Sequence, residues 1–286
     1  MGSAASSIPT KCHALKIYDI SINYYSLPES ELVDIIYNAL KKYDVCNRIS
    51  KAIIIDIQSG YTLSNTYYHC FAHATYVFQT MFILCEKLIA ADKISFSYEK
   101  LIGFLLIGLC HDLGHIGTIN TYIDTNNADT PDNWKHSHLE YMHFTKFTNL
   151  VNSHESLNSC KELLFFENNF VMDLFKYTNL SQHFQVHNYL YDENGNIIKT
   201  DNIIIIIVLL FADISSSSRN SKYNKTVHTA LQNEAIYVYG NNDKILNEIL
   251  TKIKNHHSFV DTFIKPLYNY LSEIIPIDDI VDVSLI

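Results

Sequence analysis

The apolar run Leu101–Cys110, with the polar residues that follow it, constrains the fold more than any other stretch of the chain. The run is too apolar for a surface helix and predicts a buried one. It ends in His111-Asp112-Leu113-Gly114-His115-Ile116-Gly117. Buried imidazoles and carboxylates need partners, because an unpaired buried polar group costs roughly several kcal/mol. A metal ion is the most economical partner for this donor set, so we expect a metal site where the run ends.

Helical spacing of apolar residues accounts for most of the remaining chain. Ile53–Ile57 and Ile203–Ala212 are rich in β-branched residues and favour a strand locally, but no partner strand is evident near either. We therefore predict an all-α fold: a compact multi-helix domain over residues 29–286, preceded by an irregular segment, 1–28. Helices are expected over 29–40, 64–91, 98–110, 137–151, 156–168, 170–190, 203–212, 223–239 and 243–271, with a kink or junction at Pro266.

Composition excludes several classes of protein. The chain has 286 residues, is 48% hydrophobic and 18% charged, and can therefore bury a full core. A net charge of −9 argues against a general nucleic-acid-binding protein, which would carry a basic face. The two longest apolar runs fall short of the ~20 residues of a membrane span. The six cysteines form no C-x-x-C pair, which favours free thiols in a reducing compartment over disulfides. We expect a cytoplasmic protein without a transmembrane span.

The first six residues qualify the expected localisation. Met1-Gly2-Ser3-Ala4-Ala5-Ser6 fits the N-myristoylation pattern, in which Gly2 would carry the acyl chain. One acyl chain gives only marginal membrane binding, so this would be a weak lipid anchor. The alternative is a disordered tail or a cloning remnant. The sequence does not indicate an oligomeric state.

Residues of the metal-ligand type recur on three apolar helices. His69 and His73 are four residues apart on one expected helix and would share a face. His111 and Asp112 end the next apolar helix, and Asp213 ends the Ile-rich one. A histidine pair or a terminal aspartate alone is more often structural, but the conjunction favours a metal site. Two histidines and two aspartates suit Zn²⁺, and one shared carboxylate could hold a second, harder ion such as Mg²⁺. Two ions about 4 Å apart are typical of phosphate-ester hydrolysis.

Five segments, in order, resemble the signatures of the class I 3′,5′-cyclic nucleotide phosphodiesterases, an HD-type metal phosphohydrolase family. They are Tyr68–Val77 for YHNxxHAxDV, His111–Asn120 for HDxxHxGxxN, Ser137–His143 for SxLExxH, Thr178–His183 for TDMSKH and Phe211–Ser215 for HCADLS. Together they cover roughly residues 60–270. The resemblance implies the helical phosphodiesterase fold and a binuclear metal site.

The resemblance also implies roles at the phosphate end. His73, His111, Asp112 and Asp213 would hold the first ion, expected to be zinc. Asp112 would also bridge to the second ion, expected to be magnesium or manganese. His69 would be the general acid that protonates the departing O3′.

Further residues acquire roles only through this resemblance. His115, Glu140 and His143 would orient waters and the phosphate, and Tyr68 would line the phosphate end of the pocket. Without the resemblance, Glu140 reads as a solvated surface carboxylate.

The purine end departs from the family pattern. Phe259, followed by Val260-Asp261 and Lys265-Pro266-Leu267, matches the family's closing helix and would stack on the base. The glutamine that reads the purine edge in the family is replaced by His256, and Gln232 on the preceding helix would supply the missing amide. Other departures from the signatures are Cys70, Gly114, Ile116, Asn179 and Ser216.

The expected function is hydrolysis of cAMP, cGMP or both to the 5′-monophosphate, with the cyclic nucleotide as the partner molecule. Two alternatives remain at this point. One is an HD-type phosphohydrolase acting on another nucleotide, which leaves His69, Glu140 and Phe259 unexplained. The other is a degenerate, non-catalytic domain that binds cyclic nucleotides, which His256 and Asn179 favour.

Overall fold

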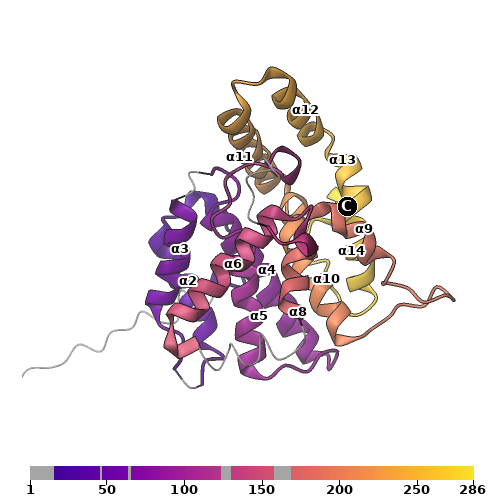
Figure 1. Ribbon diagram of the computed structural model, residues 1–286. Coiled ribbons are helices and arrows are strands. Elements are labelled where there is room, and N and C mark those ends of the chain that lie inside the picture. Colours follow the sequence, from indigo (N-terminus) through magenta and orange to yellow (C-terminus); the bar gives the residue numbers. More distant parts are fainter. Residues whose placement is uncertain (1–15, 46, 64–65, 124–129, 158–168) are drawn as a thin grey trace, which may run out of the picture.

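The computed structural model describes residues 16–286 except 46, 64–65, 124–129 and 158–168, and they form a helical bundle (Figure 1). This part of the chain contains no β-strand. A single antiparallel bridge, Tyr191 to Ile197, closes the turn predicted there. The all-α prediction is therefore confirmed.

The helices follow one another along the chain with short connections. Their bounds are α2 (Glu29–Lys41), α3 (Lys51–Thr62), α4 (Phe71–Ala90), α5 (Tyr98–Cys110), α6 (His138–Ser153), α8 (Phe170–Tyr177), α9 (His183–His187), α10 (Asp201–Ile214), α11 (Ser221–Tyr239), α12 (Asp243–Lys254), α13 (His256–Phe259) and α14 (Lys265–Ser272). Short 3₁₀ turns include η1 (Tyr24–Ser26), η2 (Asn120–Tyr122), η3 (Asp132–Trp134), η4 (Glu155–Leu157), η5 (Leu180–Gln182), η6 (Ser215–Ser218) and η8 (Val283–Leu285), and a π-helical turn, η7 (Val260–Ile264), joins α13 to α14.

Helix α4 is the centre of the bundle, and α5 and α10 pack against it. Every residue of the apolar run Leu101–Cys110 in α5 is buried, as predicted. The Ile-rich segment of α10 is helical because the Thr200 hydroxyl caps it and apolar neighbours surround it, so side-chain burial outweighs the local strand propensity. The stretch 201–218 is long and apolar enough to cross a membrane, but 72% of it is buried inside the bundle.

Several predicted helix limits are wrong. The helix expected from residue 64 begins only at Phe71, after a bend at 67–70. The segment 170–190 divides into α8, η5 and α9, because Asn179 adopts an extended backbone and its side chain accepts a hydrogen bond from the Ser181 backbone N–H. The segment 243–271 is interrupted at Asn255, and Pro266 lies in the first turn of α14, where proline is tolerated.

The N-terminal segment is partly integrated into the bundle. Ile17 and Tyr24 are buried in the core, and the Gln79 amide donates to the Ile17 carbonyl. Residues 17–28 form turns and the short η1, and they pack against the helical domain. The Gly2 motif and the predicted helix 156–168, apart from its first two residues, lie outside the described residues. Cys70, Cys85 and Cys110, which the structure describes, are free thiols.

Helices α11 and α12 pack against each other and project from the body of the bundle (Figure 1). None of the residues of α12 is fully buried. One face of α11, the segments just before α4 and just after α5, and the end of α10 line one cavity, described next.

Candidate active site

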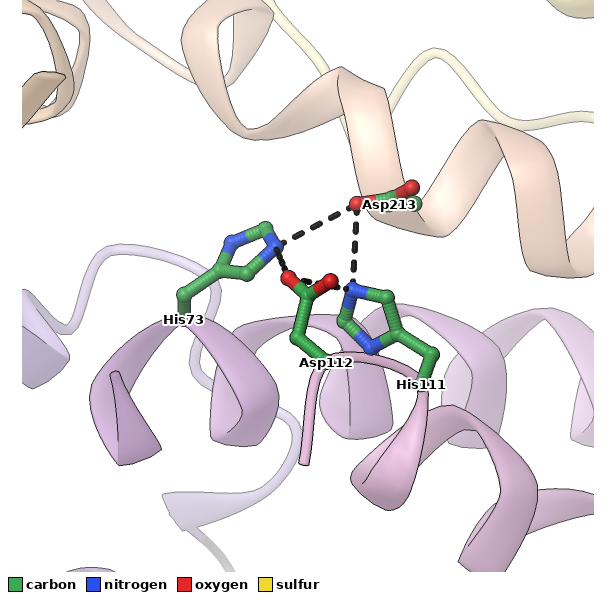
Figure 2. Close-up of side chains that lie close together, drawn as sticks. All are labelled: His73, His111, Asp112 and Asp213. Atoms are coloured by element: carbon green, nitrogen blue, oxygen red, sulfur yellow. Dashed lines mark hydrogen bonds and ion pairs between the residues drawn. The ribbon is translucent and has the colours of Figure 1, made fainter. Parts of the chain in front are cut away.

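Four predicted metal ligands converge at the ends of three core helices (Figure 2). His73 lies in the first turn of α4, His111 and Asp112 follow α5, and Asp213 is in the last turn of α10. The ligand atoms lie within 4.8 Å of one another. His111 Nε2 lies 3.0 Å from Asp112 Oδ2 and 3.2 Å from Asp213 Oδ1, and His73 Nε2 lies 3.2 Å from the same Asp213 oxygen. Two nitrogens and two carboxylates in this arrangement could hold a zinc-type ion.

Hydrogen bonding prepares His111 to act as a ligand. Its Nδ1–H donates to the Gly108 carbonyl at 2.8 Å, which leaves Nε2 facing the carboxylates. Metal-binding histidines usually donate the N–H of the ring nitrogen that does not bind the metal to a carbonyl or carboxylate, which fixes the orientation of the ring. Burial would raise the pKa values of Asp112 and Asp213, but the charge of His111 lowers both. The two carboxylates are thus stabilised by positive charge between them, as a divalent cation would provide.

Asp112 connects this cluster to a second one. Its Oδ1 lies 3.8 Å from His143 Nε2, and Asp112, His115 and His143 form another group able to hold a metal. His143 Nδ1 hydrogen-bonds the Leu113 carbonyl at 3.0 Å. Burial lowers the pKa of His143 to about 4 and that of His115 well below its usual range, so both rings are neutral at pH 7. One oxygen of Asp112 therefore faces each cluster, which fits a bridging carboxylate.

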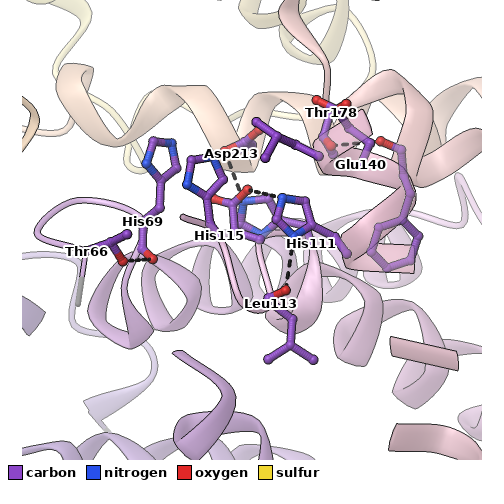
Figure 3. Close-up of polar contacts among 12 residues, drawn as sticks. Thr66, His69, His111, Leu113, His115, Glu140, Thr178 and Asp213 are labelled. Atoms are coloured by element: carbon purple, nitrogen blue, oxygen red, sulfur yellow. Dashed lines mark hydrogen bonds and ion pairs between the residues drawn. The ribbon is translucent and has the colours of Figure 1, made fainter. Parts of the chain in front are cut away.

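His69 is not on α4, contrary to the prediction. It lies in the bend before the helix, where the Thr66 hydroxyl donates to its carbonyl at 2.6 Å (Figure 3). The Glu234 carboxylate of α11 accepts the backbone N–H groups of Tyr68 and His69 at 2.9 and 3.1 Å. These bonds divert the backbone from the helical ladder, and His69 consequently approaches the cluster from beside α4.

Glu234 also pairs with the His69 ring and was not identified from the sequence. Its Oε1 contacts His69 Nδ1, and the Glu234 side chain is 4% exposed. Burial lowers the pKa of His69, but the charges of Glu234, Asp112 and Asp213 outweigh this and raise it to about 9. Burial would raise the pKa of Glu234, but the charge of His69 lowers it to about 2. A charged imidazolium with its Nε2–H free is therefore present at neutral pH.

His115 stacks on His69, and both face the same space (Figure 3). Their ring centroids lie 3.7 Å apart, at an interplanar angle of 16°. His115 Nδ1 accepts the Gly117 backbone N–H at 2.9 Å, which requires a neutral ring. Gly117 has a φ of +76°, and a Cβ there would lie 2.8 Å from Val238 Cγ2 and 3.3 Å from Glu234 Cγ. Glycine therefore allows α11 to bring Glu234 close to His69.

Gly117→Ala is expected to destabilise the fold by about 2–4 kcal/mol, from left-handed backbone strain plus overpacking against α11. Gly195→Ala is the matched control, because its φ is +78° but no atom lies within 4 Å of its Cβ position. Urea unfolding measures both. Equal losses of stability in the two variants would contradict the close approach of α11.

Glu140 is buried, not solvated as its position in the sequence suggests. The Asn120 amide donates to both of its oxygens, at 3.1 and 2.9 Å, and Asn120 Oδ1 accepts the Leu139 N–H. Burial raises the pKa of Glu140 to about 7. Glu140 therefore faces the cavity as a group that can exchange a proton near neutral pH.

These side chains line the floor of a pocket of about 970 Å³. Tyr68, His69, Asp112, His115, Glu140, His143 and Asp213 line one end, and the other end is formed by residues of α11, α12, α13 and the π-turn. The volume suits a nucleotide-sized ligand. At the far end, Phe259 is half-buried, with its ring centroid 5.2 Å from that of Phe263.

The predicted purine-end residues do not all reach the pocket. Phe259 and His256 line it. Gln232 does not: the neighbouring Leu231 lies on the wall, with Val227 and Ala235 on the same helical face. Val227, Leu231 and Ala235 are four residues apart and therefore share one face of the helix. Gln232 is the next residue after Leu231, so its side chain points about 100° away from that face. The structure therefore does not bring Gln232 to the pocket with Phe259 and His256.

Comparison with known proteins adds an independent observation. The family model of the 3′5′-cyclic nucleotide phosphodiesterases matches residues 68–282, most of the chain and every ligand described above. The chain belongs to this family. Its predicted resemblance is thereby confirmed, and it is a metal-dependent phosphodiesterase, a hydrolase of phosphoric diester bonds.

Solved structures share the fold of this phosphodiesterase. The phosphodiesterase domain of the RhoPDE fusion protein from the choanoflagellate Salpingoeca rosetta is 15% identical, with a TM-score of 0.73 over 93% of this chain and 91% of that one. A second structure of the S. rosetta rhodopsin phosphodiesterase domain is 16% identical, with a TM-score of 0.76 over 96% of this chain and 91% of that one.

Two departures from the phosphodiesterase signatures have structural explanations. Gly114 has a φ of +75°, and the stem and amine of Lys146 occupy the space where its side chain would lie. Asn179 donates to the His136 carbonyl at 2.8 Å and to Ser137 Oγ at 3.0 Å, which a carboxylate could not do for the carbonyl. Asn179 thus secures the start of α6, the helix that carries Glu140 and His143.

Proposed function

We propose that this phosphodiesterase hydrolyses cAMP, cGMP or both to the 5′-monophosphate at a binuclear metal centre. One observation carries the proposal: the ligand cluster and the charged His69–Glu234 pair lie together at one end of a nucleotide-sized pocket. A histidine with a purely structural role would not require the three carboxylates, Glu234, Asp112 and Asp213, whose charges act on His69.

The metal ligands we propose are His73, His111, Asp112 and Asp213 for a zinc ion, with Asp112 shared with a magnesium or manganese ion. The fit rests on the donor set and on the buried His111 Nε2 and His143 Nε2, which form no hydrogen bond within the described protein. Bound divalent ions supply charge neutralisation at the phosphate and a more acidic water.

The protein's own residues perform the proton transfers. His69, protonated up to about pH 9, would donate to O3′ as the P–O3′ bond breaks, and Glu234 would stabilise its charge beforehand. His115 and His143 are both neutral, and they would orient waters at the phosphate by accepting hydrogen bonds from them. Glu140 would orient a water through a carboxylate held by Asn120, and the Tyr68 hydroxyl, 3.3 Å from Ser216 Oγ, would border the phosphate.

At the purine end, Phe259 would stack on one face of the base, with the apolar wall of Val227 and Leu231 across the pocket. His256 would contact the purine edge. Asn224 Nδ2, which donates to the Ser217 carbonyl at 2.6 Å, lies 3.1 Å from His256 Nε2 and restrains the ring. This pair stands where Gln232 was expected to act.

The proposal is tested with a substrate panel. Metal-loaded protein is incubated with cAMP, cGMP, deoxynucleoside triphosphates and guanosine alarmones, and products are separated by chromatography. We expect cyclic nucleotide turnover with kcat on the order of 1–10³ s⁻¹, and a decrease of about 10²–10⁴-fold in His69→Ala. Turnover of the other nucleotides alone would favour the broader phosphohydrolase. Binding of cAMP or cGMP without turnover would favour a non-catalytic domain.

A further inference from the structure

Arg219 is a buried cation with no acidic partner among the described residues. It follows η6, outside the catalytic residues, and is 2% exposed. Its Nη2 donates to Gln79 Oε1 at 2.5 Å, whereas Nε and Nη1 have no hydrogen-bond partner in the described protein. No carboxylate oxygen of the described residues lies within 4.0 Å of the guanidinium. An unpaired buried charge costs several kcal/mol, so this arrangement requires an explanation.

Aromatic rings compensate only part of this charge. The guanidinium carbon lies 4.3 Å from the centroid of the Tyr76 ring and 5.9 Å from that of Tyr223, and the two rings are 5.2 Å apart. A desolvated cation–π contact contributes about 2 kcal/mol. This is less than the desolvation cost of the ion, so further negative charge would still be stabilising.

Several buried hydroxyl groups on the segments that contact Arg219 also lack hydrogen-bond partners among the described residues. The phenol oxygens of Tyr24, Tyr76 and Tyr223 are buried and make no hydrogen bond within the described residues, nor do the hydroxyls of Thr80 and Ser218. Tyr76 and Thr80 share one face of α4, because they are four residues apart. Tyr223 lies against the guanidinium, with its ring centroid 5.9 Å from the guanidinium carbon. Burial raises the pKa of the Tyr24 phenol, and the charge of Arg219 offsets part of this rise. Each of these hydroxyl groups could donate a hydrogen bond to a bound ligand.

The phenols cannot neutralise Arg219 themselves. Burial raises the pKa of Tyr24 and of Tyr223 well above the usual range, so both stay protonated. The nearby Asp19 is exposed, and its Oδ1 accepts hydrogen bonds from the Ser21 backbone and hydroxyl. The Gln79 amide group is committed to the carbonyls of Ile17 and Asp19.

We propose that Arg219, together with the hydroxyls of Tyr24, Tyr76, Tyr223 and Thr80, binds a small monovalent anion of the halide class, chloride in the cell. The guanidinium supplies one positive charge and two donor nitrogens without a partner among the described residues, Nε and Nη1, and the hydroxyls supply the remaining contacts. A single negative charge matches this site, whereas a phosphate dianion would exceed its charge. Neutral water could satisfy the donors but would leave the charge uncompensated.

The anion would connect three parts of the fold. Tyr24 belongs to the N-terminal segment, Tyr76 and Thr80 to α4, and Tyr223 to the first turn of α11. Bound halide should therefore stabilise the docking of residues 16–26 and the start of α11. This role is independent of the proposed catalytic function.

The test is the thermal unfolding of the full chain in sodium gluconate, with bromide replacing gluconate at constant ionic strength. Gluconate is too large to be enclosed at the site. We expect Tm to rise by about 3 °C for each tenfold increase in bromide above its Kd. Crystals grown in bromide should show an anomalous peak within hydrogen-bonding distance of Arg219.

Variants separate this site from general salt effects. Arg219→Met should abolish the bromide dependence, whereas Arg48→Met, which removes the other arginine and its surface pair with Glu99, should retain it. If Arg219→Met does not fold, Tyr223→Phe, which lacks one hydroxyl, should raise the half-saturating bromide concentration about tenfold. An equal Tm response in gluconate and bromide, or bromide crystals without a peak at Arg219, would overturn the proposal.

Discussion

Asp112→Asn is expected to reduce kcat for cyclic nucleotide hydrolysis by on the order of 10³-fold or more. Among the described residues, Asp112 is the one carboxylate that belongs to both ligand groups: Oδ2 lies 3.0 Å from His111 Nε2, and Oδ1 lies 3.8 Å from His143 Nε2. An amide offers one neutral oxygen in place of two charged ones. The variant should therefore lose metal as well as activity, and kcat and bound metal are measured on the same sample.

The control for this variant is Asp173→Asn, which removes a half-buried carboxylate of α8 that does not line the pocket. It should keep wild-type activity and metal content. Circular dichroism verifies that both variants are folded. An Asp112→Asn protein that binds two metal equivalents and retains more than a tenth of wild-type kcat would contradict the role assigned to this carboxylate.

Glu234→Gln is expected to lower kcat by about 10²-fold at pH 8 and by much less at pH 6. In the wild type, the pKa of His69 is raised to about 9, so the acid remains protonated through neutral pH and loses its proton only as the pH rises through that value. Without the Glu234 charge, burial lowers the His69 pKa and deprotonation occurs at lower pH. The alkaline limb of the kcat profile should therefore move toward neutrality.

The pH profile distinguishes this effect from a structural loss. The matched control is Glu248→Gln on α12, since Glu248 is exposed and contacts the surface side chains Lys252 and Tyr122. Its alkaline limb should coincide with that of the wild type. A Glu234→Gln profile that is uniformly lower, with an unmoved alkaline limb, would mean that Glu234 maintains the fold without tuning His69.

Ion pairing between His69 and Glu234 should also affect stability. Because the His69 pKa is raised, its contribution is complete below the ordinary pKa of 6.5 and is lost as the pH rises through about 9. The Glu234 pKa is lowered, so its contribution is present above 4.5 and is lost as the pH falls through about 2. The His69–Glu234 pair therefore stabilises the fold most between about pH 4.5 and pH 6.5, where both contributions are complete.

The sequence predicted the metal cluster because each ligand is locally encoded. His111 and Asp112 end an apolar helix, and Asp213 does the same on α10, so burial alone directs them inward. The position of His69 could not be derived in this way. Its departure from α4 depends on Glu234, which is 165 residues further along the chain. The only available signal for Glu234 was a glutamate on the otherwise apolar face that carries Val227 and Leu231.

The purine end was the least predictable part of the site. Placement of Gln232 required the rotational register of α11, and an error of one residue replaces an amide with the Leu231 side chain on the pocket wall. Likewise, the contact between Asn224 and His256 joins two helices whose relative position no local pattern specifies. Such contacts are set by tertiary packing.

The most direct test of the central claim is chromatography of cAMP and cGMP incubated with the wild-type protein loaded with Mg²⁺ or Mn²⁺. The geometry of the cluster and of His69 predicts one product, the 5′-monophosphate, which is lost when the metal is removed with EDTA and restored when it is returned. Failure of the metal-loaded protein to hydrolyse either nucleotide, or release of the 3′-monophosphate, would contradict the proposed function.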